Sequence, residues 1–233
     1  MSKKAVIFDM DGVIIDSEPL WQDAQMASLA SYGIAVTRAD CEQLTMGKRV
    51  DEIARIWCQS YALSVSAAEL EQRILTKLCQ LIARVGQAMP GVVQTLDYVK
   101  QLNLKIALAT SSNHVVIKAV FDQLKLWDKF DLVCSAEDEK QGKPAPDVYL
   151  SAAKKLNLSP QACLVIEDSV TGLTASKAAN MTTFLVSPHC EAKTFASADA
   201  KFANMIELLT FLTENEPLDV LKTFSDKARL ATS

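Results

Sequence analysis

At Phe8-Asp9-Met10-Asp11-Gly12 the sequence changes from an apolar run to an acidic turn. The preceding residues, Lys4-Ala5-Val6-Ile7, are short and apolar, so we expect a buried strand that ends here. Asp9 and Asp11 are two residues apart, and side chains at this spacing on a strand point to the same side. Two carboxylates this close repel each other unless a cation lies between them or one holds a proton. The stretch therefore indicates either a charged site or a solvated Asp-Gly turn.

Length and composition favour a folded protein with one large domain, or with a core domain and a smaller one. The chain has 233 residues, of which 49% are hydrophobic and 22% are charged. Its net charge of −4, without a basic cluster, argues against nucleic acid as the main partner. Six cysteines without a C-x-x-C pair, beside two histidines, argue against a zinc site and favour reduced thiols. We find no signal peptide and no apolar run of roughly 20 residues, so we expect a cytoplasmic protein without membrane contact.

Residues from about 16 to about 88 show only helical periodicity. One helix is expected to end at Gly33, a second follows the apolar stripe over 50–61, and a third begins at Ser66 with Glu69 in capping position. We expect no strand in this stretch. It therefore reads as an inserted helical block.

After Met89-Pro90-Gly91 the pattern changes to alternating helices and strands. Further strands are expected over 105–109, 130–134, 163–166 and 182–186, with amphipathic helices between them. This alternation is typical of an α/β protein with a Rossmann-like parallel sheet that is covered by helices on both faces. A last helix is expected over 205–212, followed at 214–233 by a short helix or a tail.

Polar side chains follow three of the expected strands. In parallel sheets of this kind, ligands bind outside the carboxyl ends of the strands, so these side chains should gather at one place. They are Asp9, Asp11, Thr110, Ser111, Glu167 and Asp168. This convergence favours a functional site over a solvated turn at Asp9.

The acidic members of this set suggest a nucleophile and a metal site. Asp9 is a candidate carboxylate nucleophile, and Asp11 can give a proton to a leaving group and later take one from water. Glu167 and Asp168 add oxygen atoms of the kind that Mg²⁺ prefers, and the cation would also offset the repulsion among the acids.

The remaining members suggest a phosphate clamp. The Thr110 side chain and the Ser111 amide could hold phosphate oxygens. Lys143, in a loop stiffened by Pro144 and Pro146, adds a positive charge. Together with the acids, these groups are typical of phosphoryl transfer from an ester.

The sequence resembles the haloacid dehalogenase superfamily of phosphatases. Four motifs, in the family's order and spacing, carry this resemblance over about residues 4 to 212. They are Asp9-Met10-Asp11-Gly12-Val13-Ile14-Ile15-Asp16-Ser17-Glu18, Ala109-Thr110-Ser111-Ser112, Lys143-Pro144-Ala145-Pro146-Asp147, and Val165-Ile166-Glu167-Asp168-Ser169-Val170-Thr171-Gly172. The resemblance implies a core domain at 1–15 and 89–213, with a small α-helical cap at 16–88 that closes over the site.

The resemblance also implies roles for single residues. Asp9 would attack the phosphorus and form an aspartyl-phosphate, and Asp11 would move protons. Thr110 and Lys143 would hold the phosphoryl group. The metal would be Mg²⁺, bound by Asp9, the Asp11 carbonyl oxygen and Asp168, with Glu167 next to it or linked through water.

Within the superfamily, the sequence is most similar to bacterial phosphatases of 2-deoxyglucose 6-phosphate and related hexose or hexitol phosphates, near the β-phosphoglucomutase-like group. In the expected cap, Trp21, Gly47 and Lys48 are candidates for substrate binding. Each of them also has a purely structural interpretation, because Trp21 can belong to the cap core and Gly47 and Lys48 to a solvated turn.

Three hypotheses follow from the sequence. The first is a Mg²⁺-dependent phosphatase of small sugar or polyol phosphates, which we expect to be a monomer. The second is a phosphomutase of the β-phosphoglucomutase type, which would transfer the phosphate to a second hydroxyl instead of water. The third is a binding protein without catalysis on the same fold, and the complete acidic motif argues against it.

Overall fold

The computed structural model describes residues 3–214 of the chain. They form two compact units, and each unit is built from segments that are separate in the sequence. The first contains residues 3–15, 88–111 and 126–214, and the second contains Asp16–Gln87 and Ser112–Lys125. No helix in the described part of the chain has the length and apolar character needed to cross a bilayer.

The first unit is built on a six-stranded parallel sheet with the order β3-β2-β1-β4-β5-β6. The first strand in the sequence therefore lies in the middle, between β2 and β4. The strands are β1 (Ala5–Phe8), β2 (Lys105–Thr110), β3 (Leu132–Ser135), β4 (Cys163–Glu167), β5 (Thr182–Val186) and β6 (Ala200–Phe202). This order places the ends of β1, β2 and β4 side by side at one edge of the sheet.

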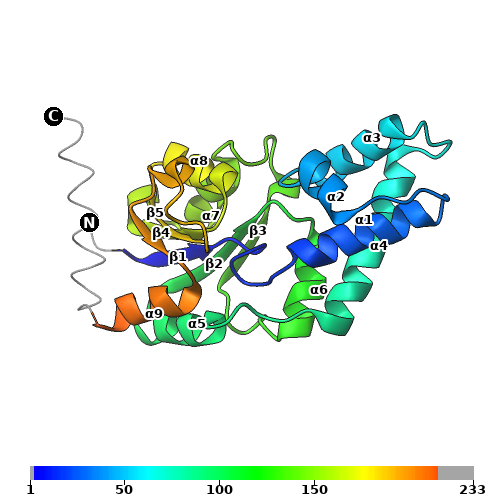
Figure 1. Ribbon diagram of the computed structural model, residues 1–233. Coiled ribbons are helices and arrows are strands. Elements are labelled where there is room, and N and C mark those ends of the chain that lie inside the picture. The colour runs from blue at the N-terminus through cyan, green and yellow to red at the C-terminus, as the bar shows by residue number, and fades with distance from the viewer. Residues whose placement is uncertain (1–2, 215–233) are drawn as a thin grey trace. The chain divides into compact units, whose positions relative to one another are not determined.

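Four helices cover the two faces of this sheet. Figure 1 shows α7 and α8 on one face and α5 and α9 on the other. Their bounds are α5 (Val92–Gln101), α7 (Asp147–Lys155), α8 (Val170–Ala178) and α9 (Met205–Glu214). Coverage on both faces explains why the central strands are mostly apolar, and every residue of β1, β4 and β5 is buried.

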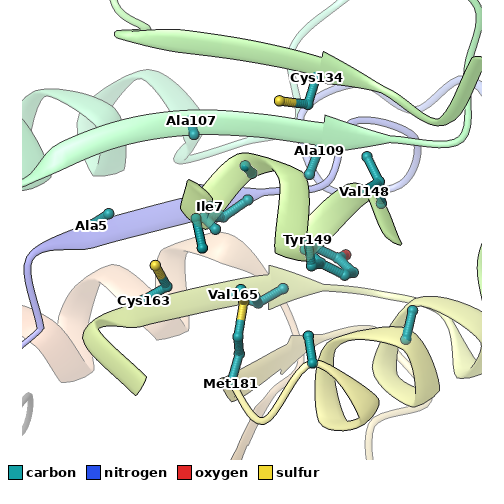
Figure 2. Packing of buried hydrophobic residues seen from close by; sticks show 14 of the residues in the cluster. Ala5, Ile7, Ala107, Ala109, Cys134, Val148, Tyr149, Cys163, Val165 and Met181 are labelled. Atoms are coloured by element: carbon teal, nitrogen blue, oxygen red, sulfur yellow. The ribbon is translucent and has the colours of Figure 1, made fainter. Parts of the chain in front are cut away.

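The core between the sheet and the α7–α8 layer is made of small and branched side chains (Figure 2). Ala5 and Cys163 mark the starts of the strands in this view, whereas Ala109, Val148 and Tyr149 lie toward their carboxyl ends. Small residues on the strands let α7 pack close to the sheet, so the residues at its N-terminal end come near the strand ends.

The second unit is entirely helical within the residues that the structure describes. The long helix α4 packs against α1, α3 and α6, and its apolar stripe is buried by them. The helices are α1 (Glu18–Ala30), α2 (Arg38–Thr45), α3 (Val50–Ser60), α4 (Ala67–Val85) and α6 (His114–Leu124). The Ser66 side chain caps α4 by accepting a hydrogen bond from the Glu69 amide.

The predicted fold class is confirmed, since a parallel sheet with helices on both faces is present. Two elements, α2 and β6, were not expected from the sequence, and the third strand begins at Leu132 instead of residue 130. The division into a core and a cap remains a prediction. In the structure the second unit includes α6, which the predicted division assigned to the core. The expected helix or tail lies outside the described residues after Glu214.

Candidate active site

The first acidic motif forms a tight turn at the end of β1. The amides of Ile14 and Ile15 both donate to the Met10 carbonyl oxygen, which folds the chain back immediately after the strand. Gly12 has φ +79°, and a Cβ atom there would lie 2.0 Å from Oδ2 of Asp168. A glycine is therefore required at this position, both for the backbone conformation and for the close approach of Asp168.

Lys143 is buried among acceptors from three parts of the sheet. Its Nζ donates to Asp9 Oδ1 at 2.6 Å, to Glu167 Oε1 at 2.7 Å and to the Ala109 carbonyl oxygen at 3.1 Å. The lysine side chain is 4% exposed, and those of Asp9 and Glu167 are 9% and 0% exposed. Burial at this level means that the ion pairs are little screened by water.

Glu167 is held by the residues that follow it in the sequence and by α7. Its Oε2 accepts from the amides of Asp168 and Ser169 and from the Ser169 hydroxyl, each at 3.0 Å. Its Oε1 accepts from the Tyr149 hydroxyl at 2.7 Å, in addition to Lys143. Donors of the protein therefore occupy both carboxylate oxygens.

The electrostatics of the site follow from this burial. Burial raises the pKa of Asp9 to about 7, although the Lys143 ammonium acts in the opposite direction. Burial opposes the charged form of Lys143, but the carboxylates of Asp9 and Glu167 outweigh it and raise its pKa well above the usual value. Lys143 thus stays protonated and partly neutralises two acids.

The two acids at the end of β4 are shifted in opposite directions. Burial opposes the charged form of Glu167, yet Lys143 and the hydrogen bonds to its carboxylate lower its pKa. Burial, followed by the charge of Glu167, raises the pKa of Asp168 well above the usual value. The surroundings of Asp168 therefore disfavour its negative charge, whereas those of Glu167 favour it.

Asp11 and Thr110 complete the set at the strand ends. The buried Thr110 hydroxyl lies 3.4 Å from Asp11 Oδ2 and donates to it. Asp11 is partly exposed. Ser111 follows Thr110 directly and is exposed.

The acidic cluster can hold a divalent cation. Carboxylate oxygens of Asp9, Glu167 and Asp168 lie within 4.8 Å of one another, although those of Glu167 already accept hydrogen bonds. The donor set consists of oxygen atoms, as Mg²⁺ requires. Burial raises the pKa values of Asp9 and Asp168, and a cation would stabilise their charged forms, so the residues fit a cation.

The structure thus brings together Asp9, Asp11, Thr110, Lys143, Glu167 and Asp168 in the first unit. Trp21, Gly47 and Lys48 belong to the second unit. There Trp21 is half-buried on α1, Gly47 has φ +72° with open space around it, and Lys48 pairs with Glu52 at 2.7 Å on the surface. Their part in substrate binding remains a prediction.

Two residues of the site were not among those expected from the sequence, Tyr149 and Ser169. Tyr149 follows Lys143 by six residues, and its ring belongs to the apolar face of α7. Ser169 caps α8 by accepting from the Gly172 amide, and it also donates to Glu167. A serine directly before a predicted helix is a recognisable capping signal and could have drawn attention to this position.

Comparisons with known proteins identify the family of the chain. The haloacid dehalogenase-like hydrolase family matches residues 3–180. Hexitol phosphatase B of Escherichia coli (strain K12) is 36% identical over 208 residues, which cover 88% of this chain and 93% of that protein. Phosphorylated carbohydrates phosphatase of Thermotoga maritima is 33% identical over 178 residues, which cover 76% and 82% of the two chains.

Solved structures give the same result. The crystal structure of β-phosphoglucomutase from Clostridium difficile has a TM-score of 0.78 and 26% identity, and the match covers 98% of this chain and 99% of that one. The family that the four motifs predicted is confirmed, and this chain belongs to the haloacid dehalogenase-like hydrolases.

Proposed function

We propose that the protein hydrolyses phosphate monoesters of small sugars or polyols, such as hexose or hexitol phosphates, in a Mg²⁺-dependent reaction. One observation carries the proposal: a buried Asp9 carboxylate contacts a buried ammonium beside a cluster of acids at the strand ends. The names of the two similar phosphatases, which act on hexitol phosphates and phosphorylated carbohydrates, support the substrate class.

In the first step, an oxygen of Asp9 attacks the phosphorus. The bond between the phosphorus and the ester oxygen breaks, and the ester oxygen takes a proton from Asp11. Thr110 and Lys143 hold the phosphoryl oxygens and offset their charge. The product is an alcohol, and the phosphoryl group is bound to Asp9.

In the second step, Asp11 accepts a proton from water as the water oxygen attacks the same phosphorus. The bond between the phosphorus and the Asp9 oxygen breaks, which releases phosphate and restores the carboxylate. The partial exposure of Asp11 allows it to act on both the alcohol and the water.

Asp9, the Asp11 carbonyl oxygen and Asp168 would hold the cation, with Glu167 behind them. When bound, Mg²⁺ supplies positive charge that neutralises the acids and the phosphate group. Because both oxygens of Glu167 already accept hydrogen bonds, we assign it to holding Lys143 and the Asp168 backbone and not to direct metal binding.

Further expectations from the sequence belong to this proposal. Trp21, Gly47 and Lys48 of the helical unit are proposed to select the alcohol part of the substrate. A monomeric protein in the cytoplasm, acting on a small phosphate ester without nucleic acid or membrane as a partner, stays a prediction.

The test is a phosphatase screen of sugar and polyol phosphates with Mg²⁺, in which specificity constants are compared. Asp9→Asn should lower kcat by about 10³-fold or more, because the amide is a poor nucleophile. Asp97→Asn, which removes a carboxylate of α5 that pairs with Lys129, should keep full activity. An Asp9→Asn protein with wild-type turnover would contradict the proposal.

A phosphomutase is the second candidate, favoured by the similarity to β-phosphoglucomutase. Incubation with β-glucose 1-phosphate and a bisphosphate primer separates the two reactions. A phosphatase releases inorganic phosphate, whereas a mutase produces glucose 6-phosphate.

A further inference from the structure

Tyr149 contacts both groups that fix the position of the lysine. Its hydroxyl donates to Glu167 Oε1 at 2.7 Å, and the same oxygen accepts from Lys143 Nζ at 2.7 Å. The Lys143 Nζ also lies 4.8 Å from the centre of the Tyr149 ring. Figure 2 shows Tyr149 beside Val148 on α7, toward the carboxyl ends of the strands.

The Glu167 carboxylate has almost no freedom to move. It is fully buried, and a Cβ atom at Gly172 would lie 1.6 Å from Oε1, so the backbone of α8 touches the carboxylate directly. Oε2 is fixed by two amides and the Ser169 hydroxyl. Among the described residues, Lys143 and Tyr149 are the donors to Oε1.

The ammonium of Lys143 in turn has three donors and three acceptors. Asp9 Oδ1, Glu167 Oε1 and the Ala109 carbonyl oxygen take one hydrogen bond each. The distance of the Lys143 ammonium from Asp9 therefore depends on how strongly Glu167 Oε1 attracts the ammonium. The Tyr149 hydroxyl is a second donor to Oε1. It offsets part of the negative charge on this oxygen and so weakens the attraction between Glu167 and the ammonium.

We propose that Tyr149 is a positioning residue, which shares Glu167 Oε1 with Lys143 and so keeps the ammonium in contact with the Asp9 carboxylate. This inference rests on the proposed function, in which Asp9 is the nucleophile. Without the hydroxyl, Oε1 has the ammonium as its single donor. Lys143 then moves toward Glu167, and Asp9 loses both charge compensation and orientation.

The kinetic test is Tyr149→Phe, which keeps the ring, its volume and its contact with the ammonium. We expect kcat to fall by about 10-fold and KM to change less than kcat, because Lys143 stays in the site and Thr110 still holds the phosphoryl group. Tyr98→Phe is the matched control, since the Tyr98 hydroxyl on α5 donates to the Leu212 carbonyl oxygen at 3.0 Å. That control should lose stability without a change in kcat.

A second measurement needs neither substrate nor metal. In the free protein, the Lys143 ammonium is buried with three acceptors, so its protons should exchange slowly with water and give a distinct NMR signal. Lys143→Arg identifies that signal by its loss. We expect Tyr149→Phe to speed the exchange by about 10-fold or more, and Tyr98→Phe to leave it unchanged.

The two measurements keep the inference separate from the proposed function. Unchanged ammonium exchange and a kcat within about 2-fold of wild type in Tyr149→Phe would overturn the positioning role, even in an active phosphatase. Failure of the wild-type protein to hydrolyse any phosphate ester would count against the proposed function alone. The exchange experiment would then still decide whether Tyr149 holds the ammonium.

Discussion

Gly172 must remain a glycine because the Glu167 carboxylate occupies the space of a side chain. A Cβ atom there would lie 1.6 Å from Oε1 and 1.9 Å from the carboxyl carbon. Gly172→Ala must therefore displace Glu167 or the first turn of α8. We expect a loss of about 1–3 kcal/mol in the free energy of unfolding and a lower kcat, measured by urea denaturation and by steady-state kinetics.

The control for this substitution is Thr174→Ala on the exposed side of the same helix. Its hydroxyl donates only to the Val170 carbonyl oxygen within α8, so the change should stay within about 0.5 kcal/mol. If Gly172→Ala matched this control in both stability and kcat, the close fit of α8 to Glu167 would be wrong.

For single residues, the sequence predicts the charged side chains of the site better than the side chains that hydrogen-bond to them. Asp9 and Glu167 were expected at one site because each follows an expected strand, and Lys143 was added because its loop matches a motif of the family. Tyr149 was not, because its ring belongs to the buried face of α7, although the ring also contacts the Lys143 ammonium and the hydroxyl donates to Glu167. Helical spacing predicts that the Tyr149 ring is buried, but it does not predict the hydrogen bond of the hydroxyl.

Among the elements, α1 carries a buried polar face that joins it to α2 and α3. Gln25 is 3% exposed, and its Oε1 accepts from Trp57 Nε1 at 2.8 Å and from the Thr45 hydroxyl at 2.9 Å. Gln25→Leu would leave the buried Trp57 N–H without this acceptor. We expect a loss of about 1–3 kcal/mol in stability, measured by urea denaturation.

A double-mutant cycle with Trp57→Phe checks the cause. Thr45 still donates to the Cys41 carbonyl oxygen when Gln25 is replaced, so the indole N–H should carry most of the penalty. In the Trp57→Phe background, Gln25→Leu should therefore be much less destabilising. Additive effects of the two substitutions would show that the penalty has another origin.

Long amphipathic elements were predictable, and short or polar ones were not. The helix α2 has eight residues, of which only Cys41 and Thr45 are buried, so it lacks an apolar stripe. The sequence feature that marks α2 is its N-terminal capping box. The Thr37 side chain accepts a hydrogen bond from the Asp40 amide, and the Asp40 side chain accepts one from the Thr37 amide. The edge strand β6 has three residues, which is too short for a periodic pattern.

At the scale of the whole molecule, contacts between segments far apart in the sequence determine to which unit α6 belongs, and local sequence patterns do not predict these contacts. Local patterns place α6 after β2 in an alternating α/β order, which favours the core. In the structure α6 packs against α4 instead, and the hydrogen bond from Cys79 Sγ to the Val115 carbonyl oxygen joins them. Hydrophobic periodicity identifies a buried face but does not identify its partner.

The stability of the molecule should depend on pH and on Mg²⁺ together. The pKa of Asp9 is about 7 in the folded protein, against an ordinary value of 3.8. Between these values the folded state holds a proton that the unfolded state has lost. The contribution of Asp9 is therefore fully present below about pH 4 and is lost as the pH rises through about 7. Asp168, whose pKa is also raised, acts in the same direction.

Mg²⁺ should reverse this loss, because it binds the deprotonated carboxylates of the folded state. We expect the increase in Tm caused by millimolar Mg²⁺ to be larger at about pH 8 than at about pH 5, measured by thermal denaturation against EDTA. Other carboxylates shape the full curve, so the comparison is with Asp9→Asn, which should show a smaller dependence of the Mg²⁺ effect on pH. Equal Mg²⁺ effects at both pH values in the wild-type protein would mean that the cation does not bind at Asp9 and Asp168.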